Sequence, residues 1–213
     1  LAHLIYLESG AGCIITSSYQ ATLPGFMANG YNKNSAKGLI LKSVQLAEEA
    51  RKRFLLINPN AAKPLIAASI GPYGAYLADG SEYRGDYIIS DQELTDFHEP
   101  RINLLDNSTA DILACETIPC FQEAKVLSEI LENVKKPAWI SFSCKDGKHI
   151  SDGTPIEKCA AYFAHHPTVF AIGVNCTSPE FISALIRSIK SKSGNKKIVI
   201  YPNSGAVYHA ESK

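Results

Sequence analysis

One stretch decides the fold: Phe170-Ala171-Ile172-Gly173-Val174-Asn175-Cys176, followed directly by Thr177-Ser178-Pro179. A short apolar run bounded by turn residues is typical of a buried parallel strand. Cys176 then lies at the carboxyl end of that strand, where α/β folds place their reactive groups. A thiolate at this position can ligate a soft metal or act as a nucleophile. The alternative is a buried cysteine that only packs.

Five further apolar runs precede or follow this one, and helical patterns separate them. Strands that alternate with helices specify right-handed βαβ units and a parallel sheet. No Gly-x-Gly-x-x-Gly follows any strand, so the repetition favours a (β/α)8 TIM-type barrel over a doubly wound dinucleotide fold. About six strand–helix units are visible, whereas a closed barrel has eight. The strand-like runs are 13–17, 65–70, 111–116, 138–143, 169–176 and 198–201, and the helical patterns cover about 35–56, 91–105, 121–134, 156–164 and 179–190.

Composition excludes several classes of function. The chain has 21 Lys and Arg against 21 Asp and Glu, a net charge of +0, so no electrostatic argument supports binding to nucleic acid or to an anionic membrane. No uninterrupted apolar stretch approaches the length of a membrane span. The six cysteines are scattered, which favours reduced thiols in a cytoplasmic protein over a disulfide framework.

Both ends of the sequence have features of an interrupted fold. The chain opens without methionine on Leu1 and Ala2, in what reads as the end of an amphipathic helix, and it closes on Ser212 and Lys213 in a polar stretch. We therefore expect residues 1–213 to form a single barrel domain that is truncated at both ends. The sequence does not indicate an oligomeric state.

Polar and reactive residues gather where the predicted strands end. Glu116 completes an apolar strand, and an acid at such a position must pair with something or bind something. Residues 73–87 form a long, aromatic, glycine-punctuated loop of the kind that covers substrates. Polar side chains concentrated at one end of the strands are the expected layout of a barrel active site.

Six short motifs occur in an order and at spacings that resemble the homocysteine S-methyltransferases. The resemblance is closest to the branch that uses S-methylmethionine or S-adenosylmethionine as methyl donor, and it spans nearly the whole chain. Each motif is weak alone, but the ordered set is specific. The motifs are Gly71-Pro72-Tyr73-Gly74, residues 81–87 (Ser-Glu-Tyr-Arg-Gly-Asp-Tyr), residues 115–119 (Cys-Glu-Thr-Ile-Pro), Asp152-Gly153-Thr154-Pro155, residues 173–176 (Gly-Val-Asn-Cys) and residues 201–205 (Tyr-Pro-Asn-Ser-Gly).

The resemblance implies a role for several residues. It implies a (β/α)8 barrel in which Cys176 is the first of three cysteines that bind Zn²⁺. Glu116 matches the acid that holds the amino group of homocysteine, and Tyr19 falls where the family lines the substrate pocket. Asn203 is a further candidate at the rim on the zinc side, and Tyr73 is a candidate for binding the donor.

The implied reaction is a zinc-dependent methyl transfer from a sulfonium donor to homocysteine, which yields methionine. Homocysteine's thiol is largely protonated at neutral pH, whereas the thiolate is the nucleophile, so binding of its sulfur to zinc would stabilise the reactive form. Three soft ligands leave the fourth tetrahedral position for the substrate. Aromatic faces such as those of Tyr73, Tyr76 or Tyr83 would favour the donor's positive charge.

The sequence departs from the family at two places. The family's first strand carries Asp-Gly-Gly, and its last strand carries Gly-Gly-Cys-Cys with the second and third zinc ligands, and neither motif occurs in residues 1–213. We therefore expect this stretch alone to be inactive. A zinc site formed by Cys120, Cys144 and Cys176 is an alternative, while Cys13, Cys115 and Cys159 are expected to pack.

Two other functions stay open at the level of sequence. The first is a non-catalytic module that keeps the homocysteine pocket without a competent metal site. The second is a different (β/α) barrel enzyme that uses Glu116 or Lys145 as an acid or base.

Overall fold

The fold is an open parallel sheet whose strands follow one another in chain order. We describe it from a computed structural model, in which residues 1–205 are described. Every neighbouring pair of strands is parallel, and within residues 1–205 the first and last strands form the edges of the sheet. The strands are β1 (Cys13–Ile15), β2 (Leu65–Ile70), β3 (Ile112–Ile118), β4 (Ala138–Phe142), β5 (Val169–Asn175) and β6 (Lys197–Tyr201).

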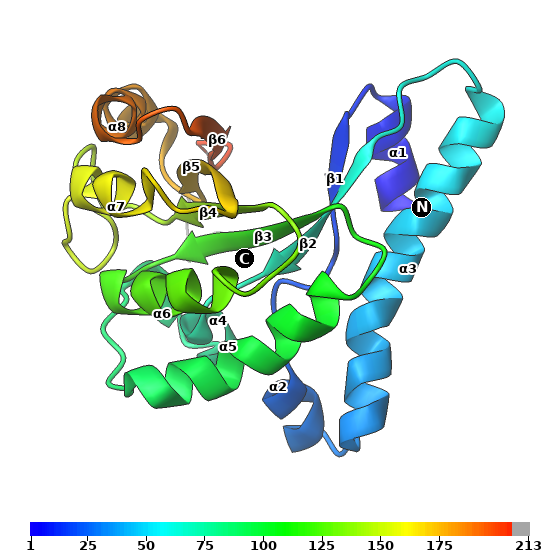
Figure 1. The fold of residues 1–213 in the computed structure, drawn as a ribbon, viewed down its shortest axis with the longest axis horizontal. Coiled ribbons are helices and arrows are strands. Elements are labelled where there is room, and N and C mark those ends of the chain that lie inside the picture. Colours follow the sequence, from blue (N-terminus) through cyan, green and yellow to red (C-terminus); the bar gives the residue numbers. More distant parts are fainter. Residues whose placement is uncertain (206–213) are drawn as a thin grey trace, which may run out of the picture.

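Helices cover the outer face of this curled sheet. Figure 1 shows α3, α5, α6, α7 and α8 following one another along the outer side of a curled sheet, with the arc open between β6 and β1. This is the incomplete (β/α) barrel that the alternating pattern predicts. The helices are α1 (Ala2–Glu8), α2 (Leu23–Ala28), α3 (Lys33–Ile57), α4 (Tyr73–Leu77), α5 (Asp91–Asp106), α6 (Phe121–Leu131), α7 (Ile156–Phe163) and α8 (Pro179–Lys192), with a 3₁₀ turn η1 (Ser81–Tyr83).

Local signals explain where the longer helices begin. Ser90 and Glu93 form a reciprocal capping box at the start of α5, as their spacing predicts. The Asn32 side chain accepts a hydrogen bond from the Ser35 amide (2.9 Å) and caps α3, which therefore begins at Lys33, two residues before the predicted start. Proline occupies the first turn of α8. The short helices α2 and α4 are not predicted by the periodicity, because a helix of one or two turns carries too few residues to establish a period.

The two faces of the sheet pack differently. The larger apolar cluster joins the strands to the surrounding helices. A smaller cluster contains strand residues only, including Ala67, Ala114, Trp139 and Ala171, so it lies on the face opposite the helices. Successive side chains on a strand alternate between faces. The inner face therefore continues, toward the carboxyl ends of the strands, into polar residues: Ser69, Glu116, Ser141 and Asn175.

One glycine allows two strands to approach closely on this inner face. A Cβ atom added to Gly173 of β5 would lie 1.6 Å from the carbonyl oxygen of Val199 in β6. No side chain fits there without displacing β6, so glycine is required by the packing.

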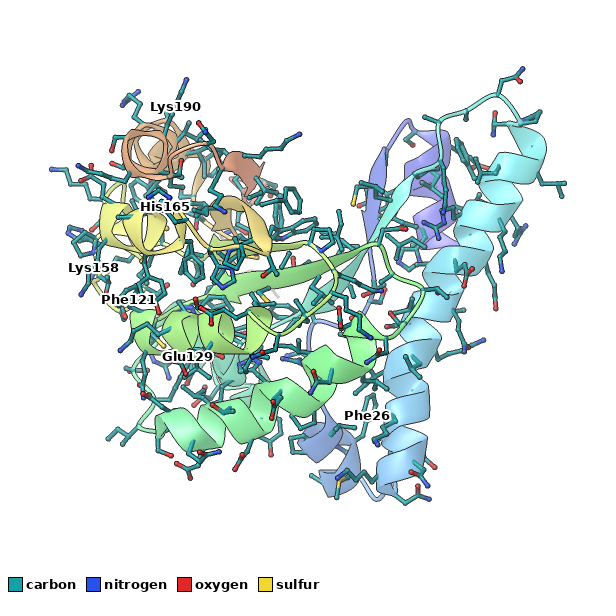
Figure 2. The ribbon with its side chains drawn as sticks, in the orientation of Figure 1. Phe26, Phe121, Glu129, Lys158, His165 and Lys190 are labelled. Atoms are coloured by element: carbon teal, nitrogen blue, oxygen red, sulfur yellow. The ribbon has the colours of Figure 1, made fainter. Side chains whose placement is uncertain are left out.

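Side-chain contacts also connect neighbouring helices of the outer layer. The Lys158 ammonium of α7 lies over the Phe121 ring at the start of α6, 4.7 Å from the ring centroid (Figure 2). Cys115 and Cys159 are buried in the large cluster, as expected of packing residues. The expectation for Cys13 is wrong, because it begins an edge strand and is exposed. Among the described residues, no helix has both the length and the apolarity needed to cross a bilayer.

Candidate functional site

Glu116 lies near the carboxyl end of β3 and is 7% exposed. Its carboxylate accepts hydrogen bonds from the hydroxyl groups of Ser69, on β2, and of Tyr201, on β6 (2.9 Å to Oε2). Burial raises the pKa of Glu116, and the two hydroxyl donors only partly oppose this shift. No lysine or arginine among the described residues makes an ion pair with it. The site therefore offers a buried carboxyl group that a cationic ligand would stabilise as the carboxylate.

Tyr201 connects Glu116 to the neighbouring strands. Its hydroxyl accepts a hydrogen bond from the Trp139 indole (3.2 Å) and lies 2.9 Å from the Ser141 hydroxyl. Ser141 in turn donates to the Asn175 side-chain carbonyl (2.8 Å). Hydrogen bonds thus connect Glu116 on β3 to Tyr201 on β6, and they continue through Ser141 on β4 to Asn175 on β5. This network fixes the orientation of each polar side chain.

Asn175 joins the ends of β3 and β5. Its side-chain oxygen accepts from the Thr117 amide (2.8 Å), and its side-chain nitrogen donates to the Thr117 hydroxyl (2.6 Å) and to the Cys176 sulfur (3.2 Å). The Thr117 hydroxyl also points at the Cys176 sulfur (3.8 Å). Both contacts to the sulfur come from donors, which suits a sulfur atom that carries negative charge.

The backbone is strained at both of these strand ends. Thr117 and Cys176 have φ angles of 62° and 49°, in the left-handed region that L-residues rarely adopt. The strain is largest for a β-branched residue such as Thr117. Such strain persists only where surrounding contacts impose it, and it is concentrated at functional sites. Here the bonds to Asn175 and the Cys176 amide, which donates to the Tyr201 carbonyl (3.3 Å), hold the two turns.

Tyr19, Glu82 and Tyr83 lie at the same end of the sheet. The Tyr19 ring packs against Gly71, where an added Cβ would lie 2.8 Å from ring carbons. Burial is the main cause that raises the pKa of both tyrosines, and the negative charges of Glu82 and of a Cys176 thiolate raise it further. Tyr19 and Tyr83 therefore lie within electrostatic range of both Glu82 and Cys176.

The two remaining predicted residues, Tyr73 and Asn203, have other contacts. The Tyr73 ring packs against Phe97 (5.0 Å between centroids), Tyr87 (5.5 Å) and Tyr76 (5.7 Å), and it lines a groove of about 590 Å³ beside α5. Its role in donor binding remains a prediction. Asn203 is exposed, and its amide donates to the Thr177 carbonyl (3.0 Å), which places it at the rim next to Cys176.

The alternative ligand set is not assembled. Burial raises the pKa of Cys120 to about 12 and that of Cys144 to about 12, which favours protonated thiols. Within residues 1–205, no three side chains of His, Cys, Asp or Glu gather as a metal site. Cys176, with two donors at its sulfur, fits the chemistry of one soft zinc ligand. The second and third cysteines implied by the resemblance do not occur in the printed sequence.

Comparisons with known proteins agree with this layout. A family model described as homocysteine S-methyltransferase matches residues 1–213. The chain belongs to the homocysteine S-methyltransferase family. The resemblance inferred from the ordered motifs is thereby confirmed at the level of the family.

Relatives of this family match the chain along nearly its whole length. Homocysteine S-methyltransferase YbgG of Bacillus subtilis is 52% identical over 215 residues, which cover 99% of this chain and 68% of the relative. Homocysteine S-methyltransferase of Escherichia coli is 48% identical over 212 residues, with 99% and 68% covered. The metallated form of the homocysteine methyltransferase MmuM from Escherichia coli superimposes with a TM-score of 0.91 at 48% identity, covering 95% of this chain and 70% of that one.

No role was assigned from the sequence to several residues of the site. A period-two pattern was available for Ser69, Ser141, Asn175 and Tyr201, because they continue the inner-face positions toward a strand's carboxyl end. Thr117 lies outside that pattern, since it directly follows Glu116. Their partners lie on other strands, however, and a single sequence does not show which strand ends meet. These residues are Ser69, Thr117, Ser141, Asn175 and Tyr201.

Proposed function

We propose that the protein catalyses a zinc-dependent methyl transfer from a sulfonium donor, S-methylmethionine or S-adenosylmethionine, to the thiolate of homocysteine, which yields methionine. One observation carries the proposal. The buried Glu116 carboxyl group and the Cys176 sulfur occupy the carboxyl ends of β3 and β5, and Thr117 and Asn175 connect them. Membership of the family supports the transfer to homocysteine.

Homocysteine carries a cation and a sulfur, and the site offers a partner for each. We assign its ammonium group to Glu116, whose carboxylate Ser69 and Tyr201 hold by hydrogen bonds. The thiol then extends toward Cys176. Because both anchor points are fixed by neighbouring strands, the amino acid would be bound in one orientation.

Cys176 is the residue of this chain that would hold zinc, together with ligands from outside residues 1–205. When bound, zinc would lower the pKa of the homocysteine thiol and hold the thiolate sulfur in place. A solved relative described as a metallated form supports this proposal. Asn175 and Thr117 would orient the Cys176 sulfur through their donated hydrogen bonds.

The transfer itself balances without a general base. The homocysteine thiolate attacks the methyl carbon, a new S–C bond forms, and the bond from that carbon to the donor's sulfur breaks. The electron pair of the broken bond stays on the donor's sulfur, which becomes a neutral thioether. The residues of this chain therefore contribute by positioning the two substrates and by stabilising charge, rather than by moving a proton.

The test uses the full-length protein with homocysteine and S-methylmethionine, with methionine formation and bound zinc as readouts. We expect one zinc per chain and loss of activity on chelation, restored by added zinc. Glu116→Ala is expected to raise the KM for homocysteine at least tenfold, since it removes a charged partner. Cys176→Ala is expected to lose zinc and activity together. Full activity in a zinc-free protein would refute the proposal.

A further inference from the structure

Glu82 has a buried carboxylate oxygen without a partner. Its Oε2 atom is inaccessible to solvent and makes no hydrogen bond within the described part of the chain. The other acids of the same loop are paired: Asp79 accepts from Ser81, and Asp86 forms an ion pair with Arg84 (3.2 Å). An unpaired buried carboxylate oxygen is costly, so its retention points to a ligand that completes it.

The backbone around Glu82 is held firmly. Its carbonyl oxygen accepts a hydrogen bond from the Ser143 hydroxyl (2.9 Å), which follows β4. Its amide nitrogen lies 2.5 Å from the position that a Cβ on Gly74 would occupy, so η1 packs directly on α4. Glu82 is therefore presented by a fixed turn at the carboxyl end of the sheet, where pre-organised groups bind best.

Two aromatic side chains share this position. Tyr83 is 54% exposed, and the Tyr19 hydroxyl is buried without a hydrogen bond of normal geometry, although Thr117 lies nearby. Both rings lie within electrostatic reach of Glu82 and of Cys176. A carboxylate with two aromatic side chains nearby is an environment that attracts cations. The cationic side chain of this loop, Arg84, is already bound to Asp79 and Asp86.

We propose that Glu82, with Tyr83 and Tyr19, forms the subsite that recognises the positive sulfonium group of the methyl donor. This inference rests on the proposed function and adds a residue that selects the donor by its charge. Glu116 is reserved for the ammonium group of homocysteine, so the two acids bind different substrates. The sulfonium becomes a neutral thioether on transfer, so the attraction to Glu82 falls and the product is released more readily.

The test measures binding by titration calorimetry on the full-length, zinc-loaded protein without homocysteine. The probes are S-methylmethionine and methionine, which differ by one methyl group and one positive charge at sulfur. Glu82→Gln is expected to weaken binding of S-methylmethionine roughly ten- to hundredfold, and to change methionine affinity less than about threefold. Glu82→Asp, which keeps the charge, is expected to recover part of the loss.

The matched control is Glu99→Gln, an exposed acid on α5 with the same change in net charge, which should leave both affinities unchanged. In the steady state, Glu82→Gln should raise the KM for the sulfonium donor and leave the KM for homocysteine nearly unaltered. The inference is overturned if Glu82→Gln weakens both probes equally, or if its effect falls on homocysteine. Failure of wild-type protein to methylate homocysteine would instead refute the proposed function, because the binding measurement does not depend on turnover.

Discussion

Burial of the ionised Glu116 side chain is unfavourable, because desolvation outweighs the two hydroxyl groups that donate to its carboxylate and raises its pKa. At the scale of single residues, the site shows this conflict repeatedly. Thr117 and Cys176 adopt left-handed backbone conformations, and Glu82 buries an unpaired oxygen. Each feature is unfavourable in the absence of a ligand, and a cationic ligand would offset the cost at the two carboxyl groups.

The raised pKa of Glu116 predicts that Glu116→Gln changes thermal stability by an amount that depends on pH. The folded protein holds this proton more tightly than the unfolded chain, so the free energy of unfolding falls as pH rises through the raised pKa. Glu116→Gln has no carboxyl group to ionise at this position, so its free energy of unfolding does not fall in this way. We expect the variant to melt at a higher temperature than wild type at pH 7. At low pH the Glu116 side chain of the wild type is protonated and uncharged, as glutamine is at every pH. The difference in melting temperature between the two proteins should therefore shrink toward pH 4.

Thermal melting of both full-length proteins between pH 4 and pH 8 measures this effect. A difference that stays constant with pH, or that grows toward acid, would contradict the assigned cause.

At the scale of elements, a buried network holds the loop of residues 71–87 to α5 and α6. The fully buried Glu123 of α6 accepts hydrogen bonds from the Tyr73 amide (2.7 Å), the Tyr87 hydroxyl and His98 Nε2 of α5 (2.6 Å). His98 Nδ1 accepts from Arg101 (3.2 Å), and burial lowers the pKa of His98, which favours its neutral form. The network positions the loop that presents Glu82, so packing outside the barrel determines the geometry at its mouth.

Removing the negative charge of Glu123 is expected to destabilise the folded protein. Glu123→Gln removes the anion that His98 connects to the buried Arg101, and it should lower the free energy of unfolding by roughly 3–5 kcal/mol. Urea denaturation of the full-length protein measures the change. The control is Glu129→Gln, an exposed acid on the same helix (Figure 2), which should shift stability by less than about 0.5 kcal/mol. Equal losses in the two variants would show that the effect comes from net charge alone.

At the scale of the whole molecule, the sheet within residues 1–205 has two unpaired edges, at β1 and β6 (Figure 1). Closed barrels remove such edges, whereas exposed ones invite pairing between chains. Only one predicted zinc ligand, Cys176, lies in this part of the chain. The matched relatives are longer, since the chain covers 68% of each of the two curated relatives described above.

A polypeptide limited to residues 1–205 is therefore expected to self-associate and to bind less than one zinc per chain. A single thiolate ligand cannot hold zinc tightly, because structural and catalytic sites need three or four protein ligands. Light scattering and metal analysis, with the full-length protein as the reference, measure both properties. A monodisperse polypeptide with one tightly bound zinc would contradict this prediction.

Some of the fold and site follows from local sequence. The six apolar runs predict the strands, and the spacing of Ser90 and Glu93 predicts the start of α5. The same pattern places Glu116 and Cys176 at strand ends, where their chemistry is needed. These features depend on side-chain period and on hydrogen bonds between near neighbours, which a single sequence records directly.

The amino-acid sequence by itself thus determined the alternating α/β architecture, the end of the sheet that carries the chemistry, and the acid and thiol at that end. Which side chains contact the acid and the thiol follows from the folded arrangement of the strands. Tyr201 reaches Glu116 across 85 residues of chain, and Asn175 reaches Thr117 across 58. The tertiary structure also packs the Tyr73 ring against Phe97 of α5 and leaves one carboxylate oxygen of Glu82 buried without a partner. Such contacts depend on the register and curl of the sheet, which arise from packing over the whole molecule rather than from any one segment.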